Sequence, residues 1–459
     1  MNPGFDCDVF IVGGGPAGTT LATLLARSGR SVMLAEREHH PRFHIGESLL
    51  PANVKLFEDL GVRDEVERIG MPKWGVEFVS QQHRHRSFLE FGDAWDKSMP
   101  LAWQVRRSEL DEILFRRAAL AGARAMQGCA VRSIEFDGEG VTVNARLEGG
   151  GNGNRNAGAS DGHGAASEQR WRARYLVDAS GRDTLLANHF GIKRKHKKHN
   201  SAALFGHFRG AKRLPGKLEG NISIFWFAQG WIWFIPLVDG TTSVGAVCWP
   251  HYLKSREKAL KGFFLDTIAM APELGERLAG AQLVDNAVYA TGNFSYAADC
   301  ASGDRHLLVG DAYAFVDPVF SSGVYLAMAS AYAAMPVIEA TLDAGPAAAR
   351  AARSRFEAHM RKGPREFTWF IVRMTNPAIR ELFMHPYNVL RTKEAVLGLL
   401  AGDIFGKTPL WWSLSAFKAI YYLTSLLMLP RAQKAWRMRR ANIRDVGEVR
   451  GENVMVSAQ

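Results

Sequence analysis

The N-terminal stretch, residues 8–36, constrains the fold more than any other part of the sequence. It reads DVFIVGGGPAGTTLATLLARSGRSVMLAE, in which an apolar run, Asp8 to Val12, leads into a glycine-rich turn. Small and aliphatic residues then follow at helical spacing from Ala17 to Leu25, Gly29 stops that pattern, and Val32 to Ala35 is a second apolar run. The pattern predicts a strand, a tight turn, a helix and a second strand.

The turn itself carries a nucleotide-binding pattern. Gly13, Gly15 and Gly18 form G-x-G-x-x-G: the first permits a tight turn, the second lets the backbone approach a pyrophosphate at the helix N-terminus, and the third allows helix and strand to pack closely. Glu36 ends the second strand, where a carboxylate accepts hydrogen bonds from ribose hydroxyls. Ala17 lies within the same G-x-G-x-x-G pattern, at the start of the predicted helix, and is a further candidate for binding the cofactor. These residues predict a Rossmann-type domain that binds a nucleotide with an unphosphorylated ribose.

Composition limits the remaining classes. The chain has 459 residues, of which 47% are hydrophobic and 22% charged, so two or three closely packed domains are expected. Its four cysteines show no C-x-x-C or metal-like spacing, which indicates reduced thiols in a cytoplasm and predicts no metal site. Acidic residues precede the first apolar run, which is therefore interpreted as a strand and not as a signal peptide. The formal charge is +11, and the basic block at residues 193–199 is interpreted as a solvated loop, with no nucleic-acid partner expected.

Three later segments narrow the nucleotide to a flavin. They are QVRRSELDEIL at residues 104–114, YLVDASGRDTLLA at 175–187 and LLVGDAYAFVDPVFSSGVYLAMASA at 307–331. Together with the N-terminus they resemble, in the same order, flavoprotein monooxygenases of the p-hydroxybenzoate hydroxylase structural class. This resemblance implies that FAD is bound, that Asp311 holds its ribityl chain and that Arg107 lies beside the flavin. It also implies that a helix starting near Ser321 points its N-terminus at the isoalloxazine ring.

Two further segments resemble a narrower family. They are HIGESLLP at residues 44–51 and GWIWFIPL at residues 230–237, which contains W-x-W-x-I-P, and both are similar to signatures of flavin-dependent halogenases. The resemblance implies that Glu47 and Ser48 of the first segment bind the cofactor. Because strand side chains alternate, Trp231 and Trp233 are predicted to share one face. The resemblance implies that they form a wall that keeps the organic substrate from the flavin while halide is oxidised. Ordinary sheet packing is the alternative, since tryptophan favours strands and large apolar surfaces.

The same resemblance suggests a halide site and a receiving group. Ser322 and Gly323 are the halide candidates, because free backbone N–H groups at a helix N-terminus bind an anion; a plain N-cap is the alternative for the serine. Lys73 is the candidate that receives hypohalous acid, either as a neutral amine, whose charged form burial disfavours, or as a hydrogen-bonding ammonium. The alternative for Lys73 is a surface lysine beside a turn.

The substrate class follows from a departure from the family pattern. Tryptophan halogenases carry a glutamate immediately before their halide loop, whereas this chain has Phe320. The resemblance therefore implies a phenol or a pyrrole as substrate, free or tethered to a carrier protein. No base for the substrate is identified, and Glu77 and Glu90 are only nearby carboxylates.

The expected organisation is α/β: a Rossmann-type FAD-binding domain with a parallel sheet, an antiparallel substrate-domain sheet and a helical C-terminal region. The expected FAD-binding parts are residues 1–73, 102–192 and 288–340, the substrate-sheet parts are 74–101 and 193–287, and the helical region is 341–459. Residues 148–169, rich in glycine, asparagine and serine, predict a flexible loop. The nearly apolar segment 408–429 precedes the basic segment 431–440, so a domain-packing helix and an interfacial membrane anchor both stay open.

The sequence thus predicts an FAD-dependent halogenase. It would use reduced FAD from a separate flavin reductase, oxygen, and chloride or bromide to halogenate an electron-rich aromatic ring in the cytoplasm, with peripheral contact at the inner face of the membrane as an option. The alternatives are an aromatic hydroxylase reduced directly by NAD(P)H, a reductase of isoprenoid double bonds, and a non-catalytic flavin-binding membrane protein.

Overall fold

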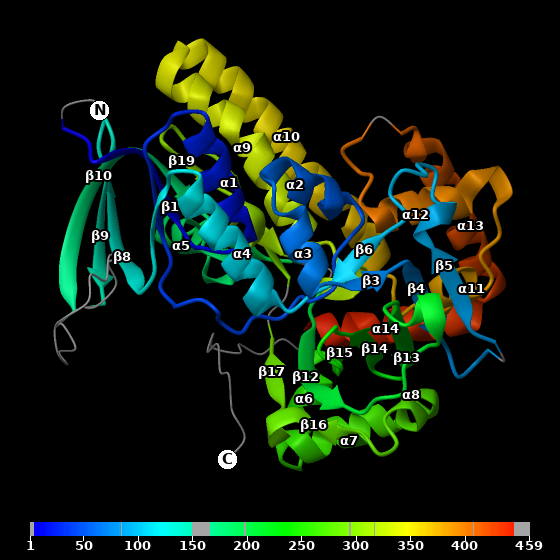
Figure 1. Ribbon diagram of the computed structural model, residues 1–459. Helices are drawn as coiled ribbons and strands as arrows, with labels where there is room; N and C mark the ends of the chain where they lie inside the picture. Colours follow the sequence, from blue (N-terminus) through cyan, green and yellow to red (C-terminus); the bar gives the residue numbers. More distant parts are fainter. Residues whose placement is uncertain are drawn as a thin grey trace.

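The structure of the protein is a computed structural model (Figure 1), which describes residues 4–83, 85–148, 166–196, 199–292, 295–315, 317–406 and 408–444. Two large sheets lie side by side, and long helices run across both of them. Two small sheets, β3 with β6 and β11 with β18 and β20, join the parts.

The first sheet holds the nucleotide-binding pattern. Its strand order is β7-β2-β1-β10-β9-β8, with β19 also paired to β10. The pairs among β7, β2, β1, β10 and β19 are parallel, and β8 and β9 add an antiparallel extension. The strands are β1 (Cys7–Val12), β2 (Val32–Ala35), β7 (Arg124–Met126), β8 (Cys129–Phe136), β9 (Val141–Leu147), β10 (Ser167–Asp178) and β19 (His306–Leu308). The predicted Rossmann-type start, with β1, the helix α1 and β2, is confirmed.

The second sheet is antiparallel except where β13 meets β4. Its order is β16-β12-β15-β14-β13-β4-β5, with β17 paired to β12. The strands are β4 (Gly75–Val79), β5 (Ser87–Glu90), β12 (Ala202–Arg209), β13 (Ile222–Phe227), β14 (Gly230–Pro236), β15 (Thr241–Cys248), β16 (Gln282–Leu283) and β17 (Tyr289–Thr291). The small sheets contain β3 (Met71–Lys73), β6 (Ala102–Gln104), β11 (Lys193–Lys195), β18 (Tyr296–Ala298) and β20 (Ala314–Phe315).

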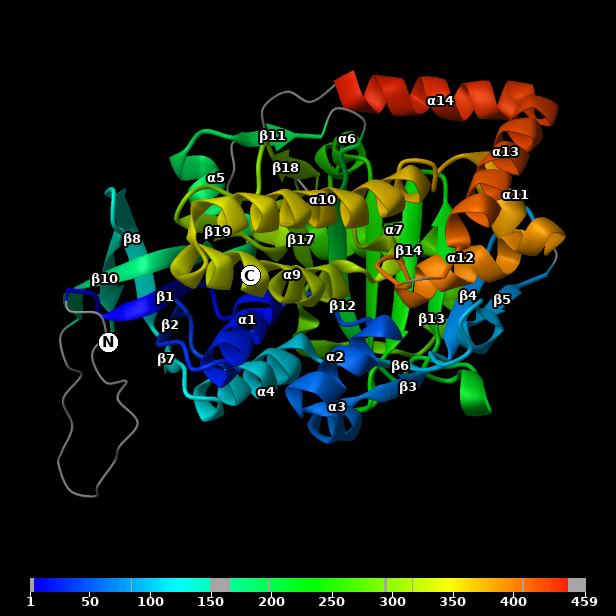
Figure 2. The ribbon, with the colours of Figure 1, turned by 90° about the horizontal axis from the view of Figure 1, so that it is seen from above.

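Helices cover both sheets and make up the C-terminal region (Figure 2). Those of the first three quarters of the chain are α1 (Pro16–Arg27), α2 (Ala52–Leu60), α3 (Arg63–Ile69), α4 (Arg107–Leu120), α5 (Leu185–His189), α6 (Pro250–Lys254), α7 (Leu260–Ala269), α8 (Pro272–Arg277) and α9 (Gly323–Asp343). The remainder are α10 (Gly345–Ile371), α11 (Pro377–Met384), α12 (Thr392–Ala401), α13 (Leu410–Leu427) and α14 (Leu429–Arg444). Among the described helices α9 alone is long and apolar enough to cross a membrane, but it packs between α1 and α10 as a core helix.

The second sheet is buried on both faces, which explains its nearly continuous apolar sequence. Along β14, Trp231, Trp233 and Ile235 belong to a core shared with the C-terminal helices. The alternate residues Ile232 and Phe234 belong to a separate core under α7 and α8. The predicted alternation is therefore confirmed, and the two tryptophans face the C-terminal helices.

Three expected boundaries differ from the structure. β17 continues the second sheet past the expected boundary at residue 287, because it pairs with β12. β10 begins at Ser167 and pairs with β9, so the expected loop at 148–169 ends earlier; residues 149–165 lie outside the described residues. The basic block expected to be a loop begins with β11, which pairs with β18. In each case a distant strand supplies the backbone hydrogen bonds.

Candidate active site

The glycine turn has the close contacts that its sequence predicts. Gly13 has φ +108°, and a Cβ atom there would lie 2.3 Å from the carbonyl oxygen of Ala179. A Cβ on Gly18 would lie 2.0 Å from the carbonyl oxygen of Gly13. Gly15 caps α1 without any side-chain hydrogen bond, so the first N–H groups of the helix are open to an anion.

Glu36 and Arg42 lie beside this turn. One carboxylate oxygen of Glu36 accepts from the backbone N–H of Gly14 at 2.8 Å, which fixes the side chain at the end of β2. The guanidinium of Arg42 lies 3.5 Å from Glu36 and 3.8 Å from the Cβ position of Gly15. Arg42 belongs to none of the sequence motifs, and it places a positive charge where a pyrophosphate would approach α1.

The segment around Asp311 meets α1 and α9. Gly310 has φ +57°, and a Cβ there would lie 3.2 Å from the Cβ atoms of both Ala17 and Ala327. This close approach brings Asp311 to the N-terminal end of α1. Burial raises the pKa of Asp311 to about 6, and no hydrogen bond or ion pair within the described ranges reaches its carboxylate. Such an acceptor fits the ribityl hydroxyls of FAD, and the N-terminus of α1 at Gly15 fits its pyrophosphate.

A second open helix N-terminus follows at α9. Ser322 occupies the N-cap position and is buried, but its side chain makes no capping hydrogen bond. The plain N-cap alternative therefore does not describe this serine. Ser321 has φ +57°, and the space around the Cβ position of Gly323 is empty to 4 Å. The geometry leaves the first N–H groups of α9 free to receive an anion.

Asp317 holds the loop that carries this helix start. Its Oδ1 accepts from the backbone N–H of Val319 at 3.1 Å. Its Oδ2 lies 2.9 Å from both the Nε2 atom of His199 and the Oγ atom of Ser201, at the start of β12. No motif in the sequence signalled His199 or Ser201, because their partner lies more than a hundred residues away.

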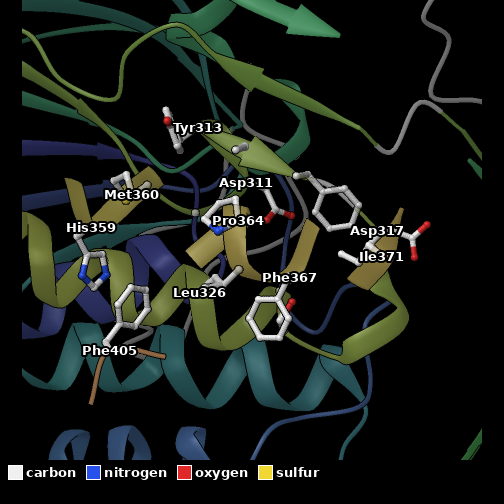
Figure 3. A pocket seen from close by; sticks show the side chains of 15 residues that line it. Asp311, Tyr313, Asp317, Leu326, His359, Met360, Pro364, Phe367, Ile371 and Phe405 are labelled. Carbon is white, nitrogen blue, oxygen red and sulfur yellow. The ribbon is translucent and has the colours of Figure 1, made fainter. Parts of the chain in front are cut away.

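A pocket lies between the start of α9, the segment around Asp311 and the C-terminal region (Figure 3). Asp311, Ser322 and Gly323 line one side of the pocket, and side chains from α10, among them Phe367, line the other. The empty volume is about 590 Å³, including the solvent-filled opening. In Figure 3 His359 and Phe405 lie at one end and Asp317 at the other. The sequence carried no motif for this wall, since aromatic residues on a long helix are indistinguishable from ordinary core positions.

The GESLLP segment is held by buried polar contacts. Arg107 forms a two-pronged ion pair with Asp111, at 2.9 and 3.1 Å, and donates to the carbonyl oxygen of Ile45 at 3.1 Å. Glu47 is buried and meets the Nε2 atom of His207 at 2.9 Å. The side chain of Glu47 is therefore engaged with the second sheet, and Arg107 is positioned across the backbone just before it.

Lys73 is almost completely buried at the end of β3. Its Nζ atom donates to the Oγ atom of Ser48 and to the carbonyl oxygen of Leu49, each at 2.9 Å, and lies 5.3 Å from the ring centre of Phe91. No carboxylate pairs with it in the described part of the chain. Burial lowers the pKa of Lys73 to about 7, so the neutral amine is accessible near physiological pH. The surface-lysine alternative is wrong.

Trp231 and Trp233 pack together, with ring centres 6.1 Å apart. The Nε1 atom of Trp233 donates to the Oγ atom of Ser243 at 3.2 Å, and a Cβ atom on Gly245 would lie 2.2 Å from the Trp233 ring. Gly245 thus makes room for that ring on the neighbouring strand. Both tryptophans share an apolar cluster with Phe320, which directly precedes the loop of α9.

The two carboxylates near Lys73 in the sequence have other partners. Glu77 is fully buried and receives two hydrogen bonds of 2.8 Å from Arg277. Glu90 is partly exposed and pairs with Lys217 at 3.1 Å. Neither carboxylate is available as a substrate base in this arrangement.

Comparison with known proteins identifies the family. The family described as FAD binding domain matches residues 6–359. The 1H-pyrrole-2-carbonyl-[peptidyl-carrier protein] chlorinase of Pseudomonas fluorescens is 30% identical over 425 residues, which cover 87% of this chain and 90% of that one. The chain belongs to the flavin-dependent halogenase family. A flavin-dependent halogenase of Armillaria mellea, armH4, is 35% identical over 358 residues, and the alignment covers 73% of this chain and 65% of armH4.

The fold agrees with this family. The myxobacterial chondrochloren halogenase CndH superposes with a TM-score of 0.74 at 30% identity, over 92% of this chain and 97% of that chain. The protein is thus an FAD-dependent enzyme of the halogenase family, as the sequence predicted. The roles of the individual site residues remain predictions. The structure places Asp311 and Ser322 in one group and Lys73 and Ser48 in a second, and the tryptophan pair belongs to the same apolar cluster as Phe320.

Proposed function

We propose that this protein halogenates an electron-rich aromatic ring through hypohalous acid, and that Lys73 directs the halogen. The observation that carries the proposal is the environment of Lys73: it is buried, no carboxylate among the described residues pairs with it, and it is held by Ser48 and the carbonyl oxygen of Leu49. Burying a lysine in this way is costly, which favours a functional role over a structural one.

Different residues of the chain have different roles in the proposed reaction. Reduced FAD together with oxygen supplies the oxidising power that converts halide to hypohalous acid. The open N-terminus of α9 at Ser322 and Gly323 binds the halide beside the flavin. Trp231 and Trp233 keep the organic substrate away from the flavin. Lys73 then receives the halogen, as a neutral amine or as an ammonium that hydrogen-bonds hypohalous acid, and presents it to the ring.

We propose a phenol or a pyrrole as substrate. Phe320 fills the position before the halide loop, and its ring packs against those of Phe367 and Phe370. A site of this kind suits rings that are already electron-rich. The Pseudomonas fluorescens relative is named for a pyrrole tethered to a peptidyl carrier protein, which supports a free or a carrier-tethered substrate here. A separate flavin reductase is proposed as the source of reduced FAD.

The test compares three forms of the enzyme. Wild type, Lys73→Met and Lys217→Met are supplied with reduced FAD from an added reductase, with oxygen, chloride or bromide, and with phenolic and pyrrolic substrates. Lys217 is the matched control, because it too lies near an aromatic ring, 4.9 Å from that of Trp74, but it is exposed. Mass spectrometry is expected to show halogenated product with wild type and Lys217→Met only. Equal product from Lys73→Met would overturn the role of Lys73.

We also propose that the protein is cytoplasmic and attaches peripherally to the inner face of an anionic membrane through α13 and α14. The inner face of α13 is buried, but Trp411, Trp412 and Leu427 are 59%, 68% and 79% exposed, and Trp436 of α14 is also exposed. Residues 404–444 contain eight lysines and arginines and no aspartate or glutamate. Figure 2 shows α14, in red, along one edge of the molecule. Exposed tryptophan and leucine beside cationic side chains are typical of an interfacial membrane helix.

Vesicle flotation tests this attachment. The full-length protein is expected to float with vesicles that contain anionic lipid, less so at high salt, and not with neutral vesicles. The double variant Trp411→Ser and Trp412→Ser should lose flotation, whereas Leu120→Ser, at an exposed leucine of α4, should retain it. Unchanged flotation of the double variant would refute the proposal. A dimer in vesicle-free solution that the same double variant abolishes would assign the surface to a second copy of the chain instead.

A further inference from the structure

Three side chains that no motif connects come together at one edge of the second sheet. They are His83, in the turn between β4 and β5, and Glu381 and His385, at the end of α11. Their possible metal-ligating atoms all lie within 4.8 Å of one another. A third imidazole is adjacent, because the ring of His85 lies 4.7 Å from that of His385.

The hydrogen bonds around the cluster leave ring nitrogens directed inward. His83 meets the Oγ atom of Ser80 through Nδ1, which leaves Nε2 facing Glu381 Oε2 at 3.1 Å. His85 donates from Nε2 to the carbonyl oxygen of Met384, so its Nδ1 carries a lone pair. Each ring thus uses one nitrogen on a group outside the cluster, as metal-ligating histidines typically do, while the second nitrogen contacts Glu381 in His83 and carries a lone pair in His85.

His385 adds to the argument. Its Nδ1 atom lies 2.9 Å from Oε1 of Glu381, yet no acceptor in the described part of the chain is aligned with it for a hydrogen bond. Two imidazole nitrogens therefore lie on either side of one carboxylate. A cation among the three groups would satisfy them all at once, which a single proton would not.

We propose that His83, Glu381 and His385 bind a divalent zinc ion. Two imidazoles and a carboxylate are a ligand set that zinc takes, and the half-exposed position leaves room for water or His85 as a fourth ligand. Cysteine spacing alone indicated no metal site, and no local pattern signals this one, because 298 residues separate His83 from Glu381.

The site would join two parts of the chain. The ring of Phe78 on β4 already stacks on that of Phe383 on α11, with centres 4.8 Å apart. A metal ion beside this contact ties the β4–β5 turn to α11, and so fixes the C-terminal helices over the sheet face that carries the tryptophan pair. Because the unfolded chain holds these ligands far apart, binding favours the folded state.

The experiment uses full-length FAD-loaded protein without a histidine tag. After treatment with a chelator, zinc is titrated calorimetrically, and thermal unfolding is followed with and without the metal. One equivalent of zinc is expected to bind and to raise the unfolding temperature. Removing a residue that only hydrogen-bonds to a metal ligand typically weakens metal binding ~10- to 100-fold. His83→Gln and His385→Gln each remove a ligand itself, so each should weaken zinc binding by more than that.

A matched control is available on the surface. His39 and Glu148 form a His–Glu pair at 3.0 Å, and His39→Gln should bind zinc as wild type does. The proposal is overturned if wild type takes up no stoichiometric zinc, or if the two cluster variants bind it as tightly as His39→Gln. It is also overturned if His83→Gln lowers the unfolding temperature without any change in the effect of zinc, since the cluster would then be a hydrogen-bond network only.

Discussion

Replacing Lys73 by methionine is expected to stabilise the protein at neutral pH and to destabilise it at high pH. Methionine has a similar length and no charge, so it keeps the packing against Phe91 and removes only the amine. Burial lowers the pKa of Lys73 from 10.5 to about 7. At about 1.36 kcal/mol for each pKa unit, the folded state carries a penalty of about 5 kcal/mol at pH 7 and below.

The pH dependence follows from which state holds the proton. Between pH 7 and 10.5 the unfolded chain binds a proton at Lys73 that the folded chain does not, so the penalty shrinks as the pH rises and vanishes above 10.5. Against this, the variant leaves the carbonyl oxygen of Leu49 and the hydroxyl of Ser48 without their donor, which costs about 1–3 kcal/mol. Lys73→Met should therefore gain about 2–4 kcal/mol at pH 7 and lose about 1–3 kcal/mol near pH 10.5.

Urea unfolding followed by tryptophan fluorescence measures this difference at several pH values with saturating FAD. Lys217→Met is the control, and its stability should stay within about 0.5 kcal/mol of wild type throughout, because Lys217 is exposed. If Lys73→Met is less stable than wild type at every pH from 6.5 to 10, the lysine is charged and well satisfied in the folded protein. That result would refute the neutral-amine reasoning.

Three further substitutions test other parts of the site. Gly245→Ala should cost about 1–3 kcal/mol and change the near-ultraviolet circular dichroism, because its Cβ atom would lie 2.2 Å from the Trp233 ring. Asp311→Asn should stabilise the FAD-free protein by an amount that grows between pH 3.8 and 6 and is constant above pH 6, because burial raises the pKa of Asp311 from 3.8 to about 6 and the folded state resists ionisation; a gain in melting temperature over wild type that is equal at pH 4 and pH 8 would contradict this. Arg277→Met should cost up to about 3–5 kcal/mol in urea unfolding, because it leaves the buried Glu77 with only the Ser223 hydroxyl and the partly exposed Arg86, 3.6 Å away; adding Glu77→Gln should recover part of that loss.

The local parts of the site could be predicted because their chemistry is contained in short segments. The tight contacts of Gly13 and Gly18 involve the turn itself and the strand beside it, so spacing alone indicated them. The shared face of Trp231 and Trp233 follows from strand alternation. For Lys73 and Ser322, only the resemblance to a family singled them out, and the burial of the lysine appears only when the chain is folded.

Other features depend on which distant segments meet. Phe367 and Phe405 line the pocket at Asp311, although nothing in their sequence context separates them from core residues. Glu77 has the sequence position of a nearby acid, but its contact with Arg277, 200 residues away, removes it from consideration as a base. Such side-chain contacts are determined by how distant helices and strands pack, and no pattern of neighbouring residues in the sequence predicts them.

The sequence by itself determined the Rossmann-type start, the flavin and the halogenase family, because backbone turns, strand alternation and contiguous motifs act over a few residues. Tertiary structure alone decided the environment of each charge. It took Lys73 out of water, buried the carboxylate of Asp311 and brought His83 together with His385. The physical reason is that a pKa, a metal site and a pocket wall all depend on which groups exclude water from one another, and this is fixed only when distant parts of the chain pack together.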